Sequence, residues 1–277
     1  MPDFTDWIGR KRSLRSSLDP WPSSAFHASI GSPAEPATGA LPLLWHWLYF
    51  LEAPQRSQQG VDGHPRRGDF FPPIDNPRRM FVGARTRAHQ PLMIGADAEL
   101  EESIVACEAK SGASGEMTML TVAYQYRQAG ILCVEEERDY MYLPARGAAE
   151  QESRCDEEVA IPPATWSWDV PTDPVLLFKY SALTFNAHRI HYDRDYARDV
   201  EAYPELVVQG PLTALLLAEL ARERLGRPLT EFSFRARAPL YAGDRLRLRG
   251  EPEPWKNSVQ LMAYRPDGKL AMTAEGR

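Results

Sequence analysis

Residues 211–226 read PLTALLLAELARERLG and decide the fold of the C-terminal part of the chain. Leucines fall on most of the circumference of a helix drawn over this stretch, and Gly226 stands where such a helix would end. A helix that is apolar on nearly every face has to be covered all round. Alternating, strand-like runs that could supply this cover follow at residues 231–238, 244–250, 258–265 and 269–275.

The N-terminal part has the same order of elements. Residues 41–51, LPLLWHWLYFL, predict a short helix that begins at Pro42 and is buried on all sides. A loop rich in Gly, Pro and Arg is predicted over residues 55–77. Alternating strands separated by glycine-containing turns are predicted over residues 79–143.

A short self-match favours duplication of one unit. Pro91–Gly95 and Pro239–Gly243 share Pro-Leu-x-x-Gly, and each follows an Arg-Ala pair and opens a charged alternating strand. We therefore predict an α+β chain of two units, each a long buried helix wrapped by a curved antiparallel sheet that can extend into the other. The expected division is residues 1–145, a proline-punctuated linker over 146–174, and residues 175–277.

Composition excludes several classes of protein. With 277 residues, 43% hydrophobic content and a formal net charge of -6, the chain has enough apolar material for real cores and is an unlikely partner for nucleic acid. Its longest apolar run is too short to span a membrane and its start lacks a secretory signal, so a cytoplasmic location is expected. Cys107, Cys133 and Cys155 are widely spaced, which predicts reduced thiols and no zinc site.

The densest group of chemically useful side chains is residues 180–193, YSALTFNAHRIHYD. Two of the six histidines of the chain fall within four residues there, beside an amide, an arginine and a carboxylate. In the simplest structural interpretation, Asn186 caps a turn, His188 is solvated and His191 packs in the core. A catalytic interpretation depends on what else in the chain accompanies this segment.

This segment resembles the signature of the (R)-specific enoyl-CoA hydratase or MaoC-like family, Ser-Gly-Asp-x-Asn-Pro-Ile/Leu-His-x-Asp. His191 matches the family histidine, Asn186 stands in place of the aspartate and His188 in place of the asparagine. Residues 207–212 and 238–244 are similar to two further motifs of that family, in the same order. The resemblance implies the hotdog fold, in which a sheet wraps a buried helix.

The N-terminal half narrows the resemblance to a double-hotdog branch. That branch contains type 2 hydroxyacyl-thioester dehydratases, mesaconyl-C4-CoA hydratases and itaconyl-CoA hydratases. The similar stretches are residues 41–50, 62–68, 71–73 and 77–80. The branch also carries Phe-Asn-Ala-His-Arg-Ile-His-Tyr-Asp, so Asn186 fits it. The first half has no equivalent catalytic motif near Leu41, which implies a scaffold and one wall of the pocket.

Hydration of an enoyl thioester needs a base, a group that orients water, and donors for the thioester oxygen as it gains negative charge. His191 is the expected base, because imidazole takes and returns protons near neutral pH. Asn186 cannot be a base, but its amide can hold the water. The backbone N–H of Gly210, at a helix N-terminus, is the expected oxyanion donor, unless Gly210 is only the small residue that a tight turn requires. Gln209 replaces a family histidine and is given no role.

Arginines near these motifs could bind a substrate carboxylate or the phosphates of coenzyme A, because a guanidinium binds both bidentately. The candidates are Arg66, Arg67, Arg78, Arg79 and Arg189. The alternative is that the arginine pairs form a solvated loop face. His46 and His64 are interpreted as structural.

The resemblance implies a hydratase for a short unsaturated dicarboxylyl-CoA, with itaconyl-CoA or mesaconyl-C4-CoA converted to citramalyl-CoA. The alternatives are an (R)-3-hydroxyacyl-thioester dehydratase of fatty acid metabolism and a hotdog protein that binds acyl-CoA without turnover. The expected partner is a small acyl-CoA, with no metal and no cofactor beyond the coenzyme A of the substrate. A homodimer is expected as the assembly, and no membrane partner is expected.

Overall fold

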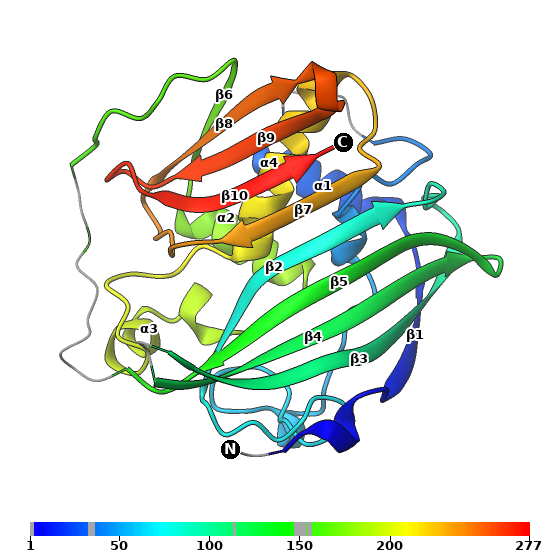
Figure 1. Cartoon of the computed structure of the whole chain (residues 1–277), viewed down its shortest axis with the longest axis vertical. Helices are drawn as coiled ribbons and strands as arrows, with labels where there is room; N and C mark the ends of the chain where they lie inside the picture. The colour runs from blue at the N-terminus through cyan, green and yellow to red at the C-terminus, as the bar shows by residue number, and fades with distance from the viewer. Residues whose placement is uncertain (1–2, 33–36, 113–114, 147–153, 155–156) are drawn as a thin grey trace.

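The structure is a computed structural model that describes residues 3–32, 37–112, 115–146, 154 and 157–277. The N-terminal half contributes the strands β1 (Lys11–Ser17), β2 (Arg78–Ala88), β3 (Asp97–Gly112), β4 (Gly115–Gln128) and β5 (Ile131–Leu143). The C-terminal half contributes β6 (Trp166–Pro171), β7 (Glu231–Ala236), β8 (Arg245–Glu253), β9 (Ser258–Tyr264) and β10 (Leu270–Gly276). Together they form one antiparallel sheet in the order β1-β3-β4-β5-β2-β7-β10-β9-β8-β6 (Figure 1).

Counted from its own edge of the sheet, each half has its strands in the same order along the chain: first, third, fourth, fifth and second. This shared order supports duplication of one unit. Strands β3 and β8, which follow the two Pro-Leu-x-x-Gly motifs, occupy equivalent places in it. The two halves join where β2 pairs with β7, from Gly83 opposite Arg235 to Arg87 opposite Glu231. The two sheets therefore extend into one another, as the sequence predicts.

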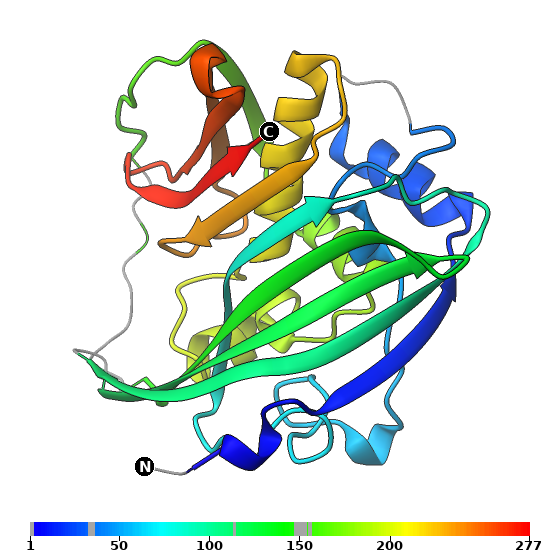
Figure 2. The ribbon, with the colours of Figure 1, turned by 45° about the vertical axis from the view of Figure 1, so that its right-hand side comes forward.

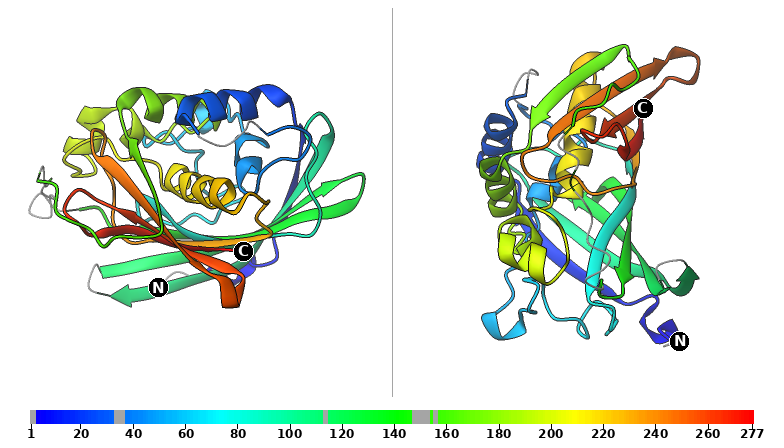
Figure 3. Two further views of the ribbon diagram at one scale, coloured as in Figure 1. Left: turned by 90° about the horizontal axis from the view of Figure 1, so that it is seen from above. Right: turned by 90° about the vertical axis from the view of Figure 1, so that its left-hand side faces the viewer.

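The helices form a layer on one side of the curved sheet (Figure 3). They are α1 (Pro20–Ile30), α2 (Pro174–Leu183), α3 (Arg194–Asp199) and α4 (Gly210–Leu225). The predicted buried helix is confirmed as α4, since residues 212–221 are all buried and the helix packs on β8, β9 and β10. Gly226 ends it in the left-handed conformation, with φ of 62°, which glycine adopts without steric cost.

The prediction of a helix over residues 41–51 is wrong. Only a short 3-10 turn, η2 (Trp45–Leu48), forms there. Leu44 and Phe50 flank it with φ of 73° and 58°, and a right-handed helix cannot continue through such residues. Residues 43–50 are nevertheless buried, as the apolar pattern indicates, whereas Leu51 is 44% exposed. The N-terminal half therefore lacks a counterpart of α4, and the loop that is predicted over residues 55–77 precedes β2 instead.

Three further features bear on the predicted organisation. Strand β1 lies against β3 at one edge of the sheet (Figure 2). Strand β6, which lies within the expected linker, pairs with β8 at the other edge. Part of that linker, residues 147–153 and 155–156 with Cys155, lies outside the described residues, and the division into domains stays a proposal. Cys107 and Cys133 are free thiols. Within the described ranges, no helix is long and apolar enough to cross a membrane.

Candidate active site

A cavity of about 1070 Å³ is lined by residues of both halves. The predicted residues Asn186, His191 and Gly210 line it together, although they come from different elements. Of the five predicted arginines, Arg79 alone contributes to the lining. The cavity is therefore a composite site, with its proposed reacting groups from one half and much of its wall from the other.

His191 ends a short 3-10 turn, η5 (Arg189–His191), and is buried. Its Nδ1 lies 2.7 Å from the carbonyl oxygen of Val207. A carbonyl can only accept, so Nδ1 carries the proton and Nε2 keeps its lone pair. Burial, followed by the charges of His188 and His64, lowers the pKa of His191 to about 3. The ring is therefore neutral near pH 7 and able to accept a proton at Nε2.

Asn186 and Gly210 lie beside this histidine in the cavity wall. Asn186 Oδ1 accepts a hydrogen bond of 3.1 Å from the backbone N–H of His188, which leaves the NH₂ group of the amide for the cavity. Gly210 is the first residue of α4, where an N–H group has no intrahelical acceptor. A Cβ added to Gly210 would lie 3.6 Å from the Phe81 carbonyl oxygen, an ordinary contact, so the turn itself does not demand glycine.

Gln209 has a structural role that the sequence does not reveal. Its side chain is fully buried and donates to the carbonyl oxygen of Leu177 at 3.0 Å and to Ser181 Oγ at 2.8 Å. These bonds hold the start of α4 against α2. The residue that replaces the family histidine therefore positions the helix terminus.

His188 is the first residue that sequence reasoning placed wrongly. The interpretation as a solvated side chain fails, because His188 is 4% exposed and lines the cavity. Its Nε2 lies 3.0 Å from Oε1 of Glu201, which is also buried. The ring centroids of His188 and His191 are 5.4 Å apart at an interplanar angle of 86°. The wider family has an asparagine at this position, so the resemblance did not point to His188 as a residue of the site.

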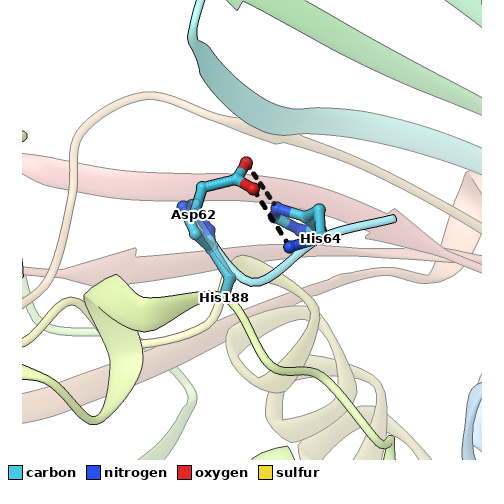
Figure 4. Close-up of side chains that lie close together, drawn as sticks. All are labelled: Asp62, His64 and His188. Atoms are coloured by element: carbon cyan, nitrogen blue, oxygen red, sulfur yellow. Dashed lines mark hydrogen bonds and ion pairs between the residues drawn. The ribbon is translucent and has the colours of Figure 1, made fainter. Parts of the chain in front are cut away.

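Asp62 and His64 come from the N-terminal half and complete the cluster (Figure 4). His64 Nδ1 lies 3.1 Å from Asp62 Oδ2, and the His64 ring centroid is 4.4 Å from that of His188. Burial, with the charges of Arg79 and His188, lowers the pKa of His64 to about 3. Burial alone would raise the pKa of Asp62. Hydrogen bonds from His64 outweigh this effect and lower that pKa to about 2. The only signal in the sequence is the Asp-x-His spacing in a stretch already similar to the family.

The loop that carries Asp62 and His64 is docked through backbone contacts on residues 180–193, called the catalytic segment below because they carry the expected base His191. The backbone N–H of Arg189 donates to the Asp62 carbonyl oxygen at 2.9 Å, and its guanidinium donates to the Val61 carbonyl oxygen at 3.2 Å. Gly63, with φ of 95°, packs so tightly that a Cβ there would overlap the carbonyl oxygen of Ala187.

Four of the predicted arginines do not line the cavity and are bonded within the protein. Arg189 pairs with Asp193 at 2.8 Å, Arg67 donates to backbone carbonyls of residues 74–77, Arg66 donates to the Gln59 carbonyl and Arg78 donates to Tyr203. Arg79 instead lies over the rings of Phe71 and Tyr140, at 5.1 and 4.5 Å from their centroids. Burial opposes its charge, but the phenols of Tyr142 and Tyr140 raise its pKa. Arg79 is therefore a charged group in the cavity wall.

The described residues offer one group of side chains with the spacing of a metal site. Ligand atoms of Asp62, His64 and His188 lie within 4.8 Å of one another. These residues also bond within the protein, Asp62 to His64 and His188 to Glu201. The absence of a metal requirement stays a prediction.

Similarity to known proteins agrees with this arrangement. The family described as hydroxyacyl-thioester dehydratase type 2 matches residues 44–242. The chain is 45% identical over 276 residues to mesaconyl-C(4)-CoA hydratase of Chloroflexus aurantiacus, covering 98% of this chain and 96% of that protein. It is 30% identical over 232 residues to the mitochondrial hydroxyacyl-thioester dehydratase type 2 of Schizosaccharomyces pombe, covering 74% and 75%.

Solved structures share the fold at low sequence identity. A MaoC-like dehydratase of Phytophthora capsici superposes with a TM-score of 0.71 at 12% identity, over 99% of this chain and 98% of that one. A Mycobacterium tuberculosis protein described as a double hotdog superposes with a TM-score of 0.59 at 14% identity, over 97% and 95%. With its double hotdog fold and a match over most of its length, the chain belongs to the hydroxyacyl-thioester dehydratase type 2 family.

Proposed function

We propose that the protein is an acyl-CoA hydratase that adds water to a short unsaturated dicarboxylyl-CoA. One observation carries the proposal: a neutral imidazole, His191, and the N-terminus of α4 line the same cavity, with Arg79 in its wall. The 45% identity to a mesaconyl-C(4)-CoA hydratase over nearly the whole chain supports this substrate class.

Each group has a place in the reaction. His191 Nε2 takes a proton from water as the water oxygen bonds to Cβ. The Asn186 amide orients the water or the thioester. The thioester oxygen gains negative charge as the enolate forms, and the N–H of Gly210 and the dipole of α4 stabilise that charge.

Charged side chains in the cavity wall support a short polar acyl group, although aromatic and aliphatic side chains make up most of the lining. Charged side chains of the N-terminal half line the cavity, and Arg12 forms ion pairs there with Glu52 and Glu102. Arg138 lines it as well and pairs with the buried Glu136 at 2.8 Å. A long alkyl chain would have to cover these groups without offering hydrogen bonds, which costs free energy.

Itaconyl-CoA and mesaconyl-C4-CoA are the proposed substrates. Itaconyl-CoA has its double bond one carbon away from conjugation with the thioester, so direct addition of water would lack enolate stabilisation. A histidine able to move an α proton could first form mesaconyl-C4-CoA and then add water at Cβ to give citramalyl-CoA.

Mass spectrometry of reactions with itaconyl-, mesaconyl-C4-, crotonyl- and octenoyl-CoA tests the proposal. We expect turnover of the two dicarboxylyl thioesters. Turnover of octenoyl-CoA alone would instead select the fatty acyl dehydratase, and tight binding without turnover would select the acyl-CoA-binding module. A homodimer remains the predicted assembly.

Arg79→Gln should lower kcat/KM for mesaconyl-C4-CoA about ten- to a hundredfold relative to crotonyl-CoA, because a charged hydrogen bond to a carboxylate contributes about 1.5–3 kcal/mol. Crotonyl-CoA has no free carboxylate, so the ratio of the two kcat/KM values is the measurement. Arg87→Gln on the same strand is the matched control, since Arg87 is exposed and pairs with Glu231. An equal loss with both substrates would indicate a contact to the phosphates of coenzyme A and contradict carboxylate recognition by Arg79.

Asn186→Asp should keep part of the activity, because a carboxylate oxygen can still accept the N–H of His188 and restores the side chain of the wider family. Asn186→Ala removes both that bond and the amide, and should lower kcat about tenfold or more. Steady-state rates with mesaconyl-C4-CoA decide between them. Rates near wild type for both variants would mean that Asn186 does not contact the reacting groups.

A further inference from the structure

Four imidazoles line the cavity. One is His46, whose Nε2 lies 3.1 Å from Glu136, and the other three, His64, His188 and His191, form a cluster in which each ring has one nitrogen bonded within the protein. His64 Nδ1 bonds to Asp62, His188 Nε2 bonds to Glu201, and His191 Nδ1 bonds to the Val207 carbonyl. The second nitrogen of each ring has no hydrogen-bond partner among the residues that the structure describes. Each ring therefore has a nitrogen available to a molecule in the cavity.

Hydration of an enoyl thioester needs two proton transfers, one from water and one to Cα. A single imidazole can serve both only if it stays within reach of both atoms. The rings of His188 and His191 stand edge to face with centroids 5.4 Å apart, which allows one substrate to contact both. The geometry thus offers one ring for each transfer.

His188 differs from the other two rings in the charge that surrounds it. Glu201 supplies a buried carboxylate at 3.0 Å, which stabilises a protonated imidazole, whereas the Val207 carbonyl at His191 carries no full charge. His64 also has a carboxylate partner, but burial, with the positive charge of Arg79, lowers its pKa and opposes its protonation. His188 is therefore the ring best suited to hold and donate a proton.

We propose that His188, paired with Glu201, is a second catalytic residue that exchanges a proton with Cα while His191 exchanges a proton with water. This inference rests on the proposed hydratase function. It assigns a reaction step to a position where the wider family has an asparagine, which has no titratable nitrogen.

The step balances without a further reactant. As His191 Nε2 takes the proton of water, the oxygen bonds to Cβ and the electron pair of the double bond moves into the thioester as an enolate. The proton on His188 Nδ1 then bonds to Cα, which leaves His188 neutral and His191 positively charged. A water molecule bridging the two rings returns the proton to His188.

Exchange of the α hydrogen of the β-hydroxyacyl-CoA product with D₂O separates the two roles. His188→Gln should lose both exchange and net dehydration by about a hundredfold or more. His191→Gln should lose dehydration to a similar extent, because hydroxide can no longer leave with a proton, yet should keep exchange within about tenfold of wild type. His89→Gln is the matched control, since His89 forms an exposed pair with Glu135 at 3.2 Å.

Glu201→Gln provides a readout that a purely structural role would not change. The groups that face His188 are Glu201, Asp62, His64 and His191, with Arg79 beyond His64. Removing the Glu201 carboxylate takes away the charged partner of His188 Nε2, so kcat and α exchange should fall together while KM stays near the wild-type value. Glu135→Gln is its control, and the thermal unfolding midpoint of each variant reports on folding.

The outcomes distinguish this inference from the proposed function. Turnover by the wild type, together with α exchange by His188→Gln within about tenfold of wild type, would contradict the inference alone. Loss of exchange in His191→Gln as complete as in His188→Gln would also contradict it, as would wild-type rates of α exchange in Glu201→Gln. No wild-type turnover of any of the four thioesters would contradict the proposed function, and this inference with it.

Discussion

His191→Gln is expected to lower kcat for hydration of mesaconyl-C4-CoA by about a hundredfold or more, with little change in the thermal unfolding midpoint. Glutamine can keep the hydrogen bond to the Val207 carbonyl through its NH₂ group, so the packing of the buried site is preserved. Its remaining oxygen is a far weaker base than the Nε2 lone pair. Steady-state kinetics beside a thermal melt would measure both quantities.

His89→Gln makes the same chemical change at an exposed site and should leave kcat at the wild-type value. If His191→Gln kept more than about a fifth of the wild-type kcat, His191 would not be the base. Reduced affinity with unchanged kcat would indicate instead that the ring only contacts bound substrate. Since the pKa of His191 is about 3, the wild-type ring stays neutral across the usual assay range, and its protonation should not limit the rate there.

The C-terminal half was predictable because local and tertiary signals agree there. The all-round apolar pattern of residues 211–225 has one favourable solution, a helix covered by a sheet, and α4 realises it. The strands that follow α4 alternate at the period of an antiparallel sheet and end at glycine or proline turns. In such a segment the sequence alone specifies both the element and its environment.

The N-terminal edge shows where tertiary contacts override the local pattern. Residues 11–17 are mostly charged or polar and gave no strand signal, yet they form β1 because their basic side chains pair with acidic ones on β3. Lys11, for example, forms an ion pair of 2.9 Å with Glu101, two positions along from its register partner Ser103. No helix was predicted in the proline-rich stretch after it. It forms α1 because Pro20 takes the first helical position and Asp19 accepts the N–H of Trp21 at 2.8 Å.

Only those residues of the site that lie close together in the sequence could be predicted. Asn186, His191 and Gly210 could be named from one segment and the helix that follows it. His64 could not, because it lies over a hundred positions from His188 and only the docking of the two halves stacks their rings. Arg189 was named for its position inside the catalytic segment, but its guanidinium turns to Asp193 and Val61 and joins the two halves.

Gly63→Ala should lower kcat/KM about a hundredfold without unfolding the protein. The added Cβ would overlap the carbonyl oxygen of Ala187, and both groups belong to backbone, so relief requires the loop to move away from the catalytic segment. That movement would carry Asp62 and His64 away from His188, and a misplacement of about 1 Å can cost about a hundredfold in rate. Steady-state kinetics and a thermal melt would measure the two effects.

Gly95→Ala separates this steric clash from backbone strain. Gly95 has a similar φ of 86°, but a Cβ there would meet nothing within 4 Å. Both variants place alanine at a positive φ, which costs stability on the order of 1 kcal/mol. Gly63→Ala should lose more, because the clash also disturbs the docking contacts of the loop. Only Gly63→Ala should lose activity, because only there does the new methyl group separate the halves of the site. If the two variants were equally active, the docked loop would not contribute to catalysis, and the cluster that includes His64 would reduce to the residues of the C-terminal half.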